Sequence, residues 1–193
     1  MSDPSAPKEA SAPPRILIVS GPSGVGKSSV CERLLSSGAL YLSVSATTRE
    51  PRGEEQDGVH YHYLTQEDFL RRVEAGEFLE WARVHGETCY GTLAAPIEEA
   101  LAAGRHVLLD IDVQGADILR KKGLPVLSVL LKATPAQLRA RLEARGDTTP
   151  EQIAKRLEYA QGELVQAWRY DLMITNDDLD RTEAALRAFL GIE

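Results

Sequence analysis

The sequence lacks several features that mark particular classes of protein. Its 193 residues include only two cysteines, Cys31 and Cys89. Their spacing fits no metal site, and free thiols are favoured over a single disulfide between them. No run of about 18 apolar residues occurs, so we expect no membrane-spanning helix.

An excess of positive charge is also lacking. The chain carries 22 Lys and Arg against 29 Asp and Glu, which gives a formal net charge of −7. An acidic chain binds nucleic acids and membrane surfaces poorly, so we expect neither as a partner. Any anion site must therefore be local and built from a few arginines and lysines.

The N-terminal segment 1–13 has no apolar core and no cleavage site, so it does not read as a signal peptide. It is rich in Pro, Ala and Ser, a composition typical of a disordered tail. We expect this tail to precede one folded region at 14–193 in a cytoplasmic protein. A chain of this length can bury one core and a small subdomain, but not two full domains.

Five short apolar runs predict the strands of a central sheet. Several are continuous stretches of Val, Ile and Leu, the pattern of parallel strands that are buried on both faces. Helical patterns lie between them, which predicts an α/β layered fold with a mostly parallel five-stranded sheet. The runs are 16–19, 40–44, 107–111, 126–131 and 171–175.

The longest helical pattern begins at a capping box formed by Thr149, Pro150 and Gln152. Other helical patterns cover 28–37, 65–76, 96–103, the segment from 134 onward, and 180–189. The apolar stripe of the longest helix, which we expect to face the core, consists of Ile153, Leu157, Leu164 and Trp168.

The segment from about 45 to 95 interrupts the alternation of strands and helices. It is rich in Arg, Glu, Tyr, His and Gly and contains short alternating pieces such as VHYHYL. We interpret it as a small mixed insertion on the ligand side of the sheet.

Residues 21–28, GPSGVGKS, match the pattern G-x-x-x-x-G-K-[ST] between a predicted strand and a predicted helix. Backbone N–H groups of such a loop surround phosphate oxygens, and the helix N-terminus adds partial positive charge. Lys27 can reach the β- and γ-phosphates, and the Ser28 hydroxyl can ligate Mg²⁺ as the cofactor. The motif alone leaves a GTPase, a transporter ATPase and a small-molecule kinase open. The predicted ATP-binding loop comprises Gly21, Pro22, Ser23, Gly24, Val25, Gly26, Lys27 and Ser28.

Three further blocks follow the loop in order. They read SVSATTREPRGEEQDGVHY at 43–61, FLEWARVHGETCYGT at 78–92 and VLLDIDVQGA at 107–116. Together with the loop they resemble the guanylate kinase family, from about residue 14 to the C-terminus. A small GTPase would instead need an N-K-x-D segment, and the chain has no Asn-Lys dipeptide.

The resemblance implies a P-loop fold of three layers that transfers the γ-phosphoryl group of ATP to GMP or dGMP. It also implies that 45–95 binds GMP and that a helical lid spans about 133–162. The implied guanine-reading residues are Ser45, Glu80, Thr92 and Asp112. The implied GMP-phosphate residues are Arg49, Arg52, Tyr61 and Tyr90. The family also has an Asn-Asp pair late in its sequence, near the adenine, and Asn176 and Asp177 match this pair.

The chemistry of these residues agrees with the implied roles. A carboxylate such as Glu80 accepts from the guanine N1–H and N2–H groups, and guanidinium and phenol groups suit a phosphate dianion. The acceptor phosphate is already ionised near pH 7, so transfer depends on electrostatics and positioning rather than on a general base. The candidate catalytic residues are Lys27, Arg52, Arg145 and Arg156, the last two from the implied lid.

Some assignments stay open at this point. Asp110 orients Lys27 or Mg²⁺-bound water, or it only caps a turn. The family pattern is altered at Glu54, at Cys89 and in the length of HGETCYGT. The alternative functions are an inactive protein-binding module of the same fold and a P-loop kinase for another phosphate ester. Monomer and dimer are both open.

Overall fold

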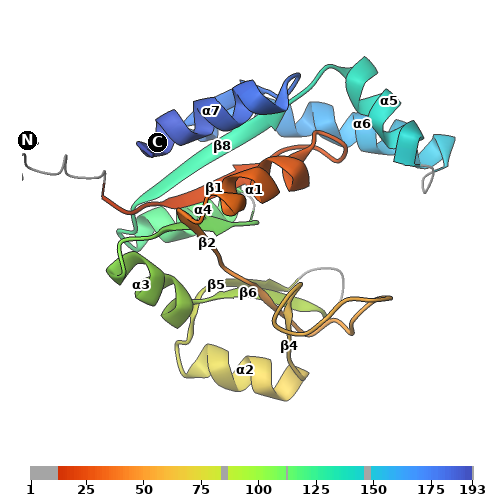
Figure 1. Cartoon of the computed structure of the whole chain (residues 1–193). Helices are drawn as coiled ribbons and strands as arrows, with labels where there is room; N and C mark the ends of the chain where they lie inside the picture. The colour runs from red at the N-terminus through yellow and green to blue at the C-terminus, as the bar shows by residue number, and fades with distance from the viewer. Residues whose placement is uncertain (1–12, 84–86, 112, 146–148, 193) are drawn as a thin grey trace, which may run out of the picture.

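Two sheets of different size organise the chain (Figure 1). The computed structural model describes residues 13–83, 87–111, 113–145 and 149–192, with the side chains at 113, 114 and 145 left undescribed. No helix in this described part of the chain has both the length and the apolarity needed to cross a membrane.

The larger sheet has five strands in the order β2-β7-β1-β8-β9, and every pairing is parallel. Each strand overlaps one of the five apolar runs, so the predicted central sheet is confirmed. The strands are β1 (Ile16–Ser20), β2 (Leu40–Leu42), β7 (His106–Leu109), β8 (Val126–Lys132) and β9 (Leu172–Thr175).

Both faces of β1 are buried, which explains its continuous apolar sequence. Alternation along the strand sends Leu17 and Val19 to one face, and Ile16 and Ile18 to the other. These four side chains are at most 1% exposed. A polar residue at any of the four positions would lie in the core, so the strand has no polar face to present.

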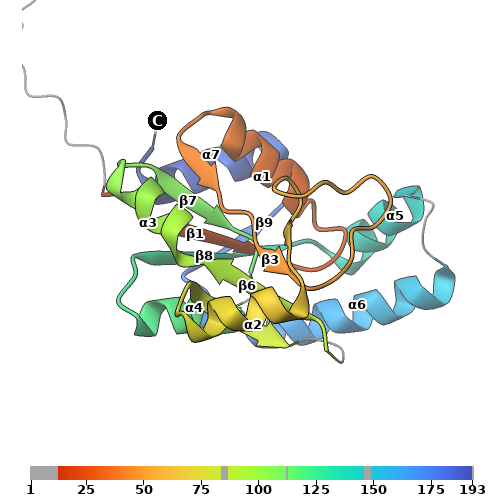
Figure 2. The same ribbon diagram turned by 90° about the horizontal axis from the view of Figure 1, so that it is seen from below.

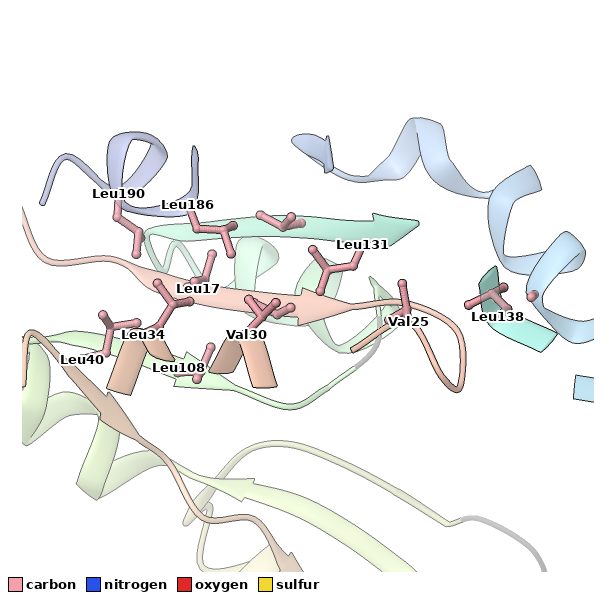
Figure 3. Packing of buried hydrophobic residues seen from close by; sticks show 13 residues of the cluster. Leu17, Val25, Val30, Leu34, Leu40, Leu108, Leu131, Leu138, Leu186 and Leu190 are labelled. Carbon is pink, nitrogen blue, oxygen red and sulfur yellow. The ribbon is translucent and has the colours of Figure 1, made fainter. Parts of the chain in front are cut away.

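Helices cover the two faces of this sheet and make the outer layers. On one face α1 (Lys27–Ser36) and α7 (Leu179–Leu190) pack with Leu17 and Leu131, and Figure 3 shows this cluster. On the other face lie α3 (Ala94–Ala102) and α4 (Val113–Lys121), which Figure 2 shows from below.

The sequence did not predict α4. The helix is nine residues long and contains Gly115, which weakens the helical signal. Gly115 lies close to Ile111, since a Cβ built on it would come within 2.9 Å of the Ile111 Cδ1 atom. Packing against the sheet therefore stabilises a helix that local propensity does not indicate.

The smaller sheet is mixed and has the order β4-β3-β6-β5. Its four strands all lie within 45–95, so the small mixed insertion that the sequence predicts is confirmed. Helix α2 (Gln66–Glu74) covers it by stacking the buried Phe69 on Phe78, with ring centroids 4.5 Å apart. The strands are β3 (Ala46–Thr47), β4 (His62–Tyr63), β5 (Phe78–Arg83) and β6 (Cys89–Leu93).

Two more helices, α5 (Pro135–Arg145) and α6 (Pro150–Val165), extend beyond the carboxyl end of β8 (Figure 1). The capping box at Thr149 and Gln152 is confirmed. The predicted apolar stripe is only half right: Ile153 and Leu157 pack on the core, whereas Leu164 and Trp168 are 41% and 81% exposed. Helix α6 ends at Val165, and the 3₁₀ turn at Ala167–Arg169 redirects the chain.

A carboxylate fixes the start of β9 against β8. Asp171 accepts hydrogen bonds from the backbone N–H and the hydroxyl of the fully buried Ser128, at 2.7 and 2.9 Å, and pairs with Arg120 of α4. Burial raises the pKa of Asp171, but these hydrogen bonds and the Arg120 charge outweigh it and leave the pKa below its usual value.

We expect Asp171→Asn to lower the free energy of unfolding by about 1 kcal/mol at pH 7, because the charge that strengthens these bonds is lost. A depressed folded-state pKa gives the wild type stability above the usual carboxyl pKa, and that stability is lost as the pH falls. The difference between wild type and variant should therefore shrink below about pH 4. Urea unfolding measures it, with Glu98→Gln on the exposed side of α3 as control. A difference that is constant with pH contradicts this role.

Candidate functional site

The glycine-rich loop lies where β1 ends and α1 begins. Gly26 is in the left-handed region at φ 94°, directly before the first turn of α1. A Cβ on it would come within 2.7 Å of the Asn176 amide nitrogen. The loop encloses a hollow of about 610 Å³, lined by residues 21–29 and by Arg141. Backbone N–H groups at a helix N-terminus beside such a hollow suit phosphate.

Lys27 is the first residue of α1 and forms an ion pair with Asp110. Asp110 follows β7, the parallel neighbour of β1, so the sheet brings the two side chains to one edge. Of the roles left open for Asp110, the structure supports orientation of Lys27.

The Val25 carbonyl is held by two side chains that are distant in sequence. It accepts from Asn176 Nδ2 at 2.7 Å and from Arg141 Nη1 at 2.8 Å. Arg141 also donates to the Asn176 carbonyl at 2.9 Å, and Thr182 of α7 donates to Asn176 Oδ1 at 2.9 Å. Asn176 is thus buried behind the loop and fixes its shape.

One predicted lid arginine contacts the loop. Arg156 of α6 donates to the Ser23 hydroxyl at 2.9 Å. The side chain of Arg145 lies outside the described residues, although its backbone ends α5. Asp177 pairs with Arg181 at 3.3 Å.

The metal donors of this region are few. Within the described ranges, no group of three or more His, Cys, Asp and Glu side chains could hold a metal ion. The exposed Ser28 hydroxyl lines the hollow beside Lys27. A single hydroxyl fits Mg²⁺, which keeps several waters and binds largely through phosphate oxygens.

A second cluster lies on the smaller sheet. Glu80 of β5 and Thr92 of β6 are cross-strand partners, and the buried Thr92 hydroxyl donates to Glu80 Oε1 at 2.5 Å. This bond orients the Glu80 carboxylate. Asp112, the other acidic residue predicted to read guanine, lies outside the described residues.

Arg49 is surrounded by aromatic rings. Its guanidinium lies 5.3 Å from the Tyr61 ring centroid and 5.9 Å from that of Tyr63, and the Tyr61 ring contacts Tyr90 edge-on at 5.9 Å. A hydrogen-bonded ion pair with Glu55 raises the pKa of Arg49, so its charge is permanent. Arg52, three residues on, is exposed.

The two clusters are neighbours. A hollow of about 140 Å³ is lined by Ser45 and Tyr61 from the smaller sheet's side and by Asp110, the partner of Lys27, from the central sheet's edge. The structure therefore brings the Lys27–Asp110 pair of the glycine-rich loop close to the tyrosine rings around Arg49, and the oriented Glu80 carboxylate lies on the smaller sheet.

The structure accommodates Cys89 and Glu54, the two described residues at which the sequence departs from the family pattern. Cys89 is fully buried against Ala46, Phe69 and Phe78, while Tyr90, the next residue, points to the opposite face of the strand. Glu54 is exposed. The lengthened HGETCYGT segment falls partly on 84–86, outside the described residues.

The two cysteines are free thiols, as predicted. Burial, together with the nearby Asp110 charge, raises the pKa of Cys31 to about 11. Little reactive thiolate therefore forms there at neutral pH.

Three residues in these clusters were missed by the sequence analysis: Arg141, Glu55 and Tyr63. Arg141 has no signal in the sequence, because its targets are backbone carbonyls. Glu55 stands beside Glu54 in a polar loop, and nothing local distinguishes the two.

We expect Asn176→Asp to lower the free energy of unfolding by about 2–3 kcal/mol, because a buried carboxylate would face the Val25 carbonyl oxygen. Denaturant unfolding measures it. Gln161→Glu makes the same change at an exposed position of α6 and should cost less than about 0.5 kcal/mol. Equal effects of the two substitutions would contradict the bracing role of Asn176.

Comparison with known proteins agrees with this geometry. A family model described as guanylate kinase matches residues 13–193. The guanylate kinase of Chelativorans sp. (strain BNC1) is 49% identical over 183 residues, covering 92% of this chain and 83% of that protein. The guanylate kinase of Nocardia farcinica (strain IFM 10152) is 48% identical over 172 residues, covering 86% of this chain and 87% of that protein.

A solved structure is similar as well. The crystal structure of guanylate kinase from Anaplasma phagocytophilum aligns with a TM-score of 0.70 and 31% identity, covering 92% of this chain and 84% of that chain. The resemblance inferred from four sequence blocks is thereby confirmed. The chain belongs to the guanylate kinase family.

Proposed function

We propose that this protein transfers the γ-phosphoryl group of ATP to GMP, giving ADP and GDP, and that dGMP is a second acceptor. The observation that carries the proposal is the shared hollow of Ser45, Tyr61 and Asp110. Its lining includes Asp110, which pairs with Lys27, and Tyr61, which contacts Arg49, and this supports a site for transfer between two phosphates.

On the donor side, the loop 21–28 binds the ATP phosphates and Lys27 reaches the β- and γ-oxygens. Ser28, together with the phosphates, would hold Mg²⁺, which would supply positive charge next to the transferring group. Asn176 and Asp177 lie on the adenine side. The brace from Asn176 to Val25 supports a part for Asn176 in shaping the loop as well.

On the acceptor side, Glu80 accepts from guanine N1–H and N2–H. The bond from Thr92 supports this role, because a carboxylate that is already oriented loses less freedom on binding. Ser45 and Asp112 complete the contacts to the base. Thr92 acts here mainly through Glu80.

Arg49, Arg52, Tyr61 and Tyr90 bind the phosphate of GMP. Two phosphate groups repel each other, so the site needs cations more than it needs a base. Lys27, Arg52, Arg145 and Arg156 supply them at the point of transfer. The contact between Arg156 and Ser23 supports this place for one of them.

The segment of about 133–162 would act as the lid that keeps water from the γ-phosphate. We also propose the cytoplasm as its location. A protein-binding module without activity would not need the intact Gly21, Gly26, Lys27 and Ser28. A coupled assay of ADP release with GMP, dGMP, AMP, UMP and no acceptor separates the candidate functions.

Lys27→Met should abolish GMP-dependent ADP release, because Lys27 is the loop's cation for the β- and γ-phosphates. Circular dichroism checks folding. Lys121→Met removes a lysine near the end of α4 and serves as the matched control. A folded Lys27→Met protein with near-normal turnover would remove the loop from the mechanism.

Glu80→Ala should reduce kcat/KM for GMP about 100-fold, because two hydrogen bonds to a charged group are lost. Adenine offers an acceptor at N1, so the variant should also narrow the gap between GMP and AMP. The measurement is kcat/KM for both nucleotides, with the exposed Glu74→Ala as control. A loss below about threefold for GMP would show that Glu80 does not read the base.

A further inference from the structure

Glu55 is held by three residues of the arginine and tyrosine cluster. Its carboxylate accepts from Arg49 Nη1 at 2.8 Å and Nη2 at 3.0 Å, from the Arg52 backbone N–H at 2.7 Å, and from the Tyr63 hydroxyl at 2.8 Å. A bidentate contact of this kind fixes the plane of the guanidinium.

The carboxylate is itself locked in place by its own turn. The Glu55 N–H donates to the Arg52 carbonyl at 3.0 Å, and the Glu55 side chain returns to the Arg52 N–H. Moving the carboxylate aside would break this reciprocal pair. Glu55 is therefore a fixed part of the loop rather than a side chain that an incoming phosphate displaces.

Different tyrosines beside Arg49 contact Glu55 and line the hollow at Asp110. Glu55 is on the side of Tyr63, which donates to it. Tyr61 contacts Tyr90 and lines the hollow that Asp110 also lines. Glu55 uses the Nη1–Nη2 edge of Arg49, and a guanidinium has a second edge, formed by Nε and Nη2, for another oxyanion.

We propose that Glu55 is a positioning residue for the GMP phosphate: it holds Arg49 so that the second edge of the guanidinium faces the phosphate. This inference rests on the proposed function of Arg49. Arg49 also donates to the Glu50 carbonyl at 2.7 Å, which limits its freedom from a third direction.

Glu55 stays negatively charged, so its contact with Arg49 does not depend on pH near neutrality. The Arg49 hydrogen bonds, followed by the Arg52 backbone bond, lower the pKa of Glu55 to about 2. The carboxylate is therefore ionised wherever the enzyme works. Its negative charge opposes phosphate binding, whereas its bidentate hold on Arg49 favours it, and on this proposal the second effect is the larger one.

Glu55→Gln tests the proposal with little change in shape. An amide oxygen in place of Oε2 can still accept from Tyr63, from the Arg52 N–H and from Arg49 Nη1. The amide nitrogen in place of Oε1 cannot accept from Arg49 Nη2, so the bidentate contact that fixes the guanidinium plane is lost. The KM for GMP should rise about tenfold, the cost of ordering a long side chain again on binding. The KM for ATP and kcat at saturating GMP should stay within about twofold. The matched control is Glu54→Gln, which makes the same substitution one residue away at an exposed position.

A second arm uses Arg49→Ala. If Glu55 acts through Arg49, Glu55→Gln in that background should leave GMP affinity, measured by calorimetry, unchanged within about twofold. NMR of the Arg49 Nε–Hε group gives a readout without substrate, and Glu55→Gln should increase its motion. A purely structural role would instead lower the thermal unfolding temperature and reduce activity equally in both backgrounds.

Four results overturn the proposal: an unchanged KM for GMP, a lower KM for GMP, an effect that persists without Arg49, or unchanged motion of the Arg49 side chain. A lower KM would show that Glu55 competes with the phosphate. Failure of the proposed function is distinguishable, because it appears as a wild-type protein with no GMP-dependent ADP release while the NMR arm still reports on Arg49.

Discussion

The site depends first on one backbone carbonyl, that of Val25. Asn176 and Arg141 both donate to it, and through them the loop is tied to the segment after β9 and to α5. A phosphate loop binds through backbone N–H groups, so its affinity follows from its shape. The carbonyl that is fixed here belongs to the residue before Gly26, at the point where the chain enters α1.

The charged side chains of the site are also held in place by other groups of the protein. Asp110 holds Lys27, Glu55 holds Arg49, and Thr92 holds Glu80. In each of these three pairs, a partner from the protein sets the direction of a group that is proposed to touch a substrate. Preorganised groups lose little freedom when the substrate arrives, which is where much of their electrostatic effect comes from.

The parts that sequence could predict are those with a local signal. The strand, loop and helix around Lys27 follow from one motif, and the central strands follow from continuous apolar runs. Leu164 shows the limit, since periodicity says which residues share a helix face but not whether the core reaches that face. Glu55 and Arg141 were missed because their partners are brought near by a turn and by the packing of α5, neither of which leaves a pattern in the chain.

The ion pairs of the site also explain how a chain with a net charge of −7 can bind two anions selectively. Lys27 and Arg49 are each neutralised by a carboxylate, so neither presents an open positive patch to anions in general. A phosphate gains from these cations only if it also fits the N–H groups of the loop or the second edge of Arg49 and the neighbouring phenols. Selectivity therefore comes from geometry, and the acidic surface adds repulsion toward polyanions that lack that geometry.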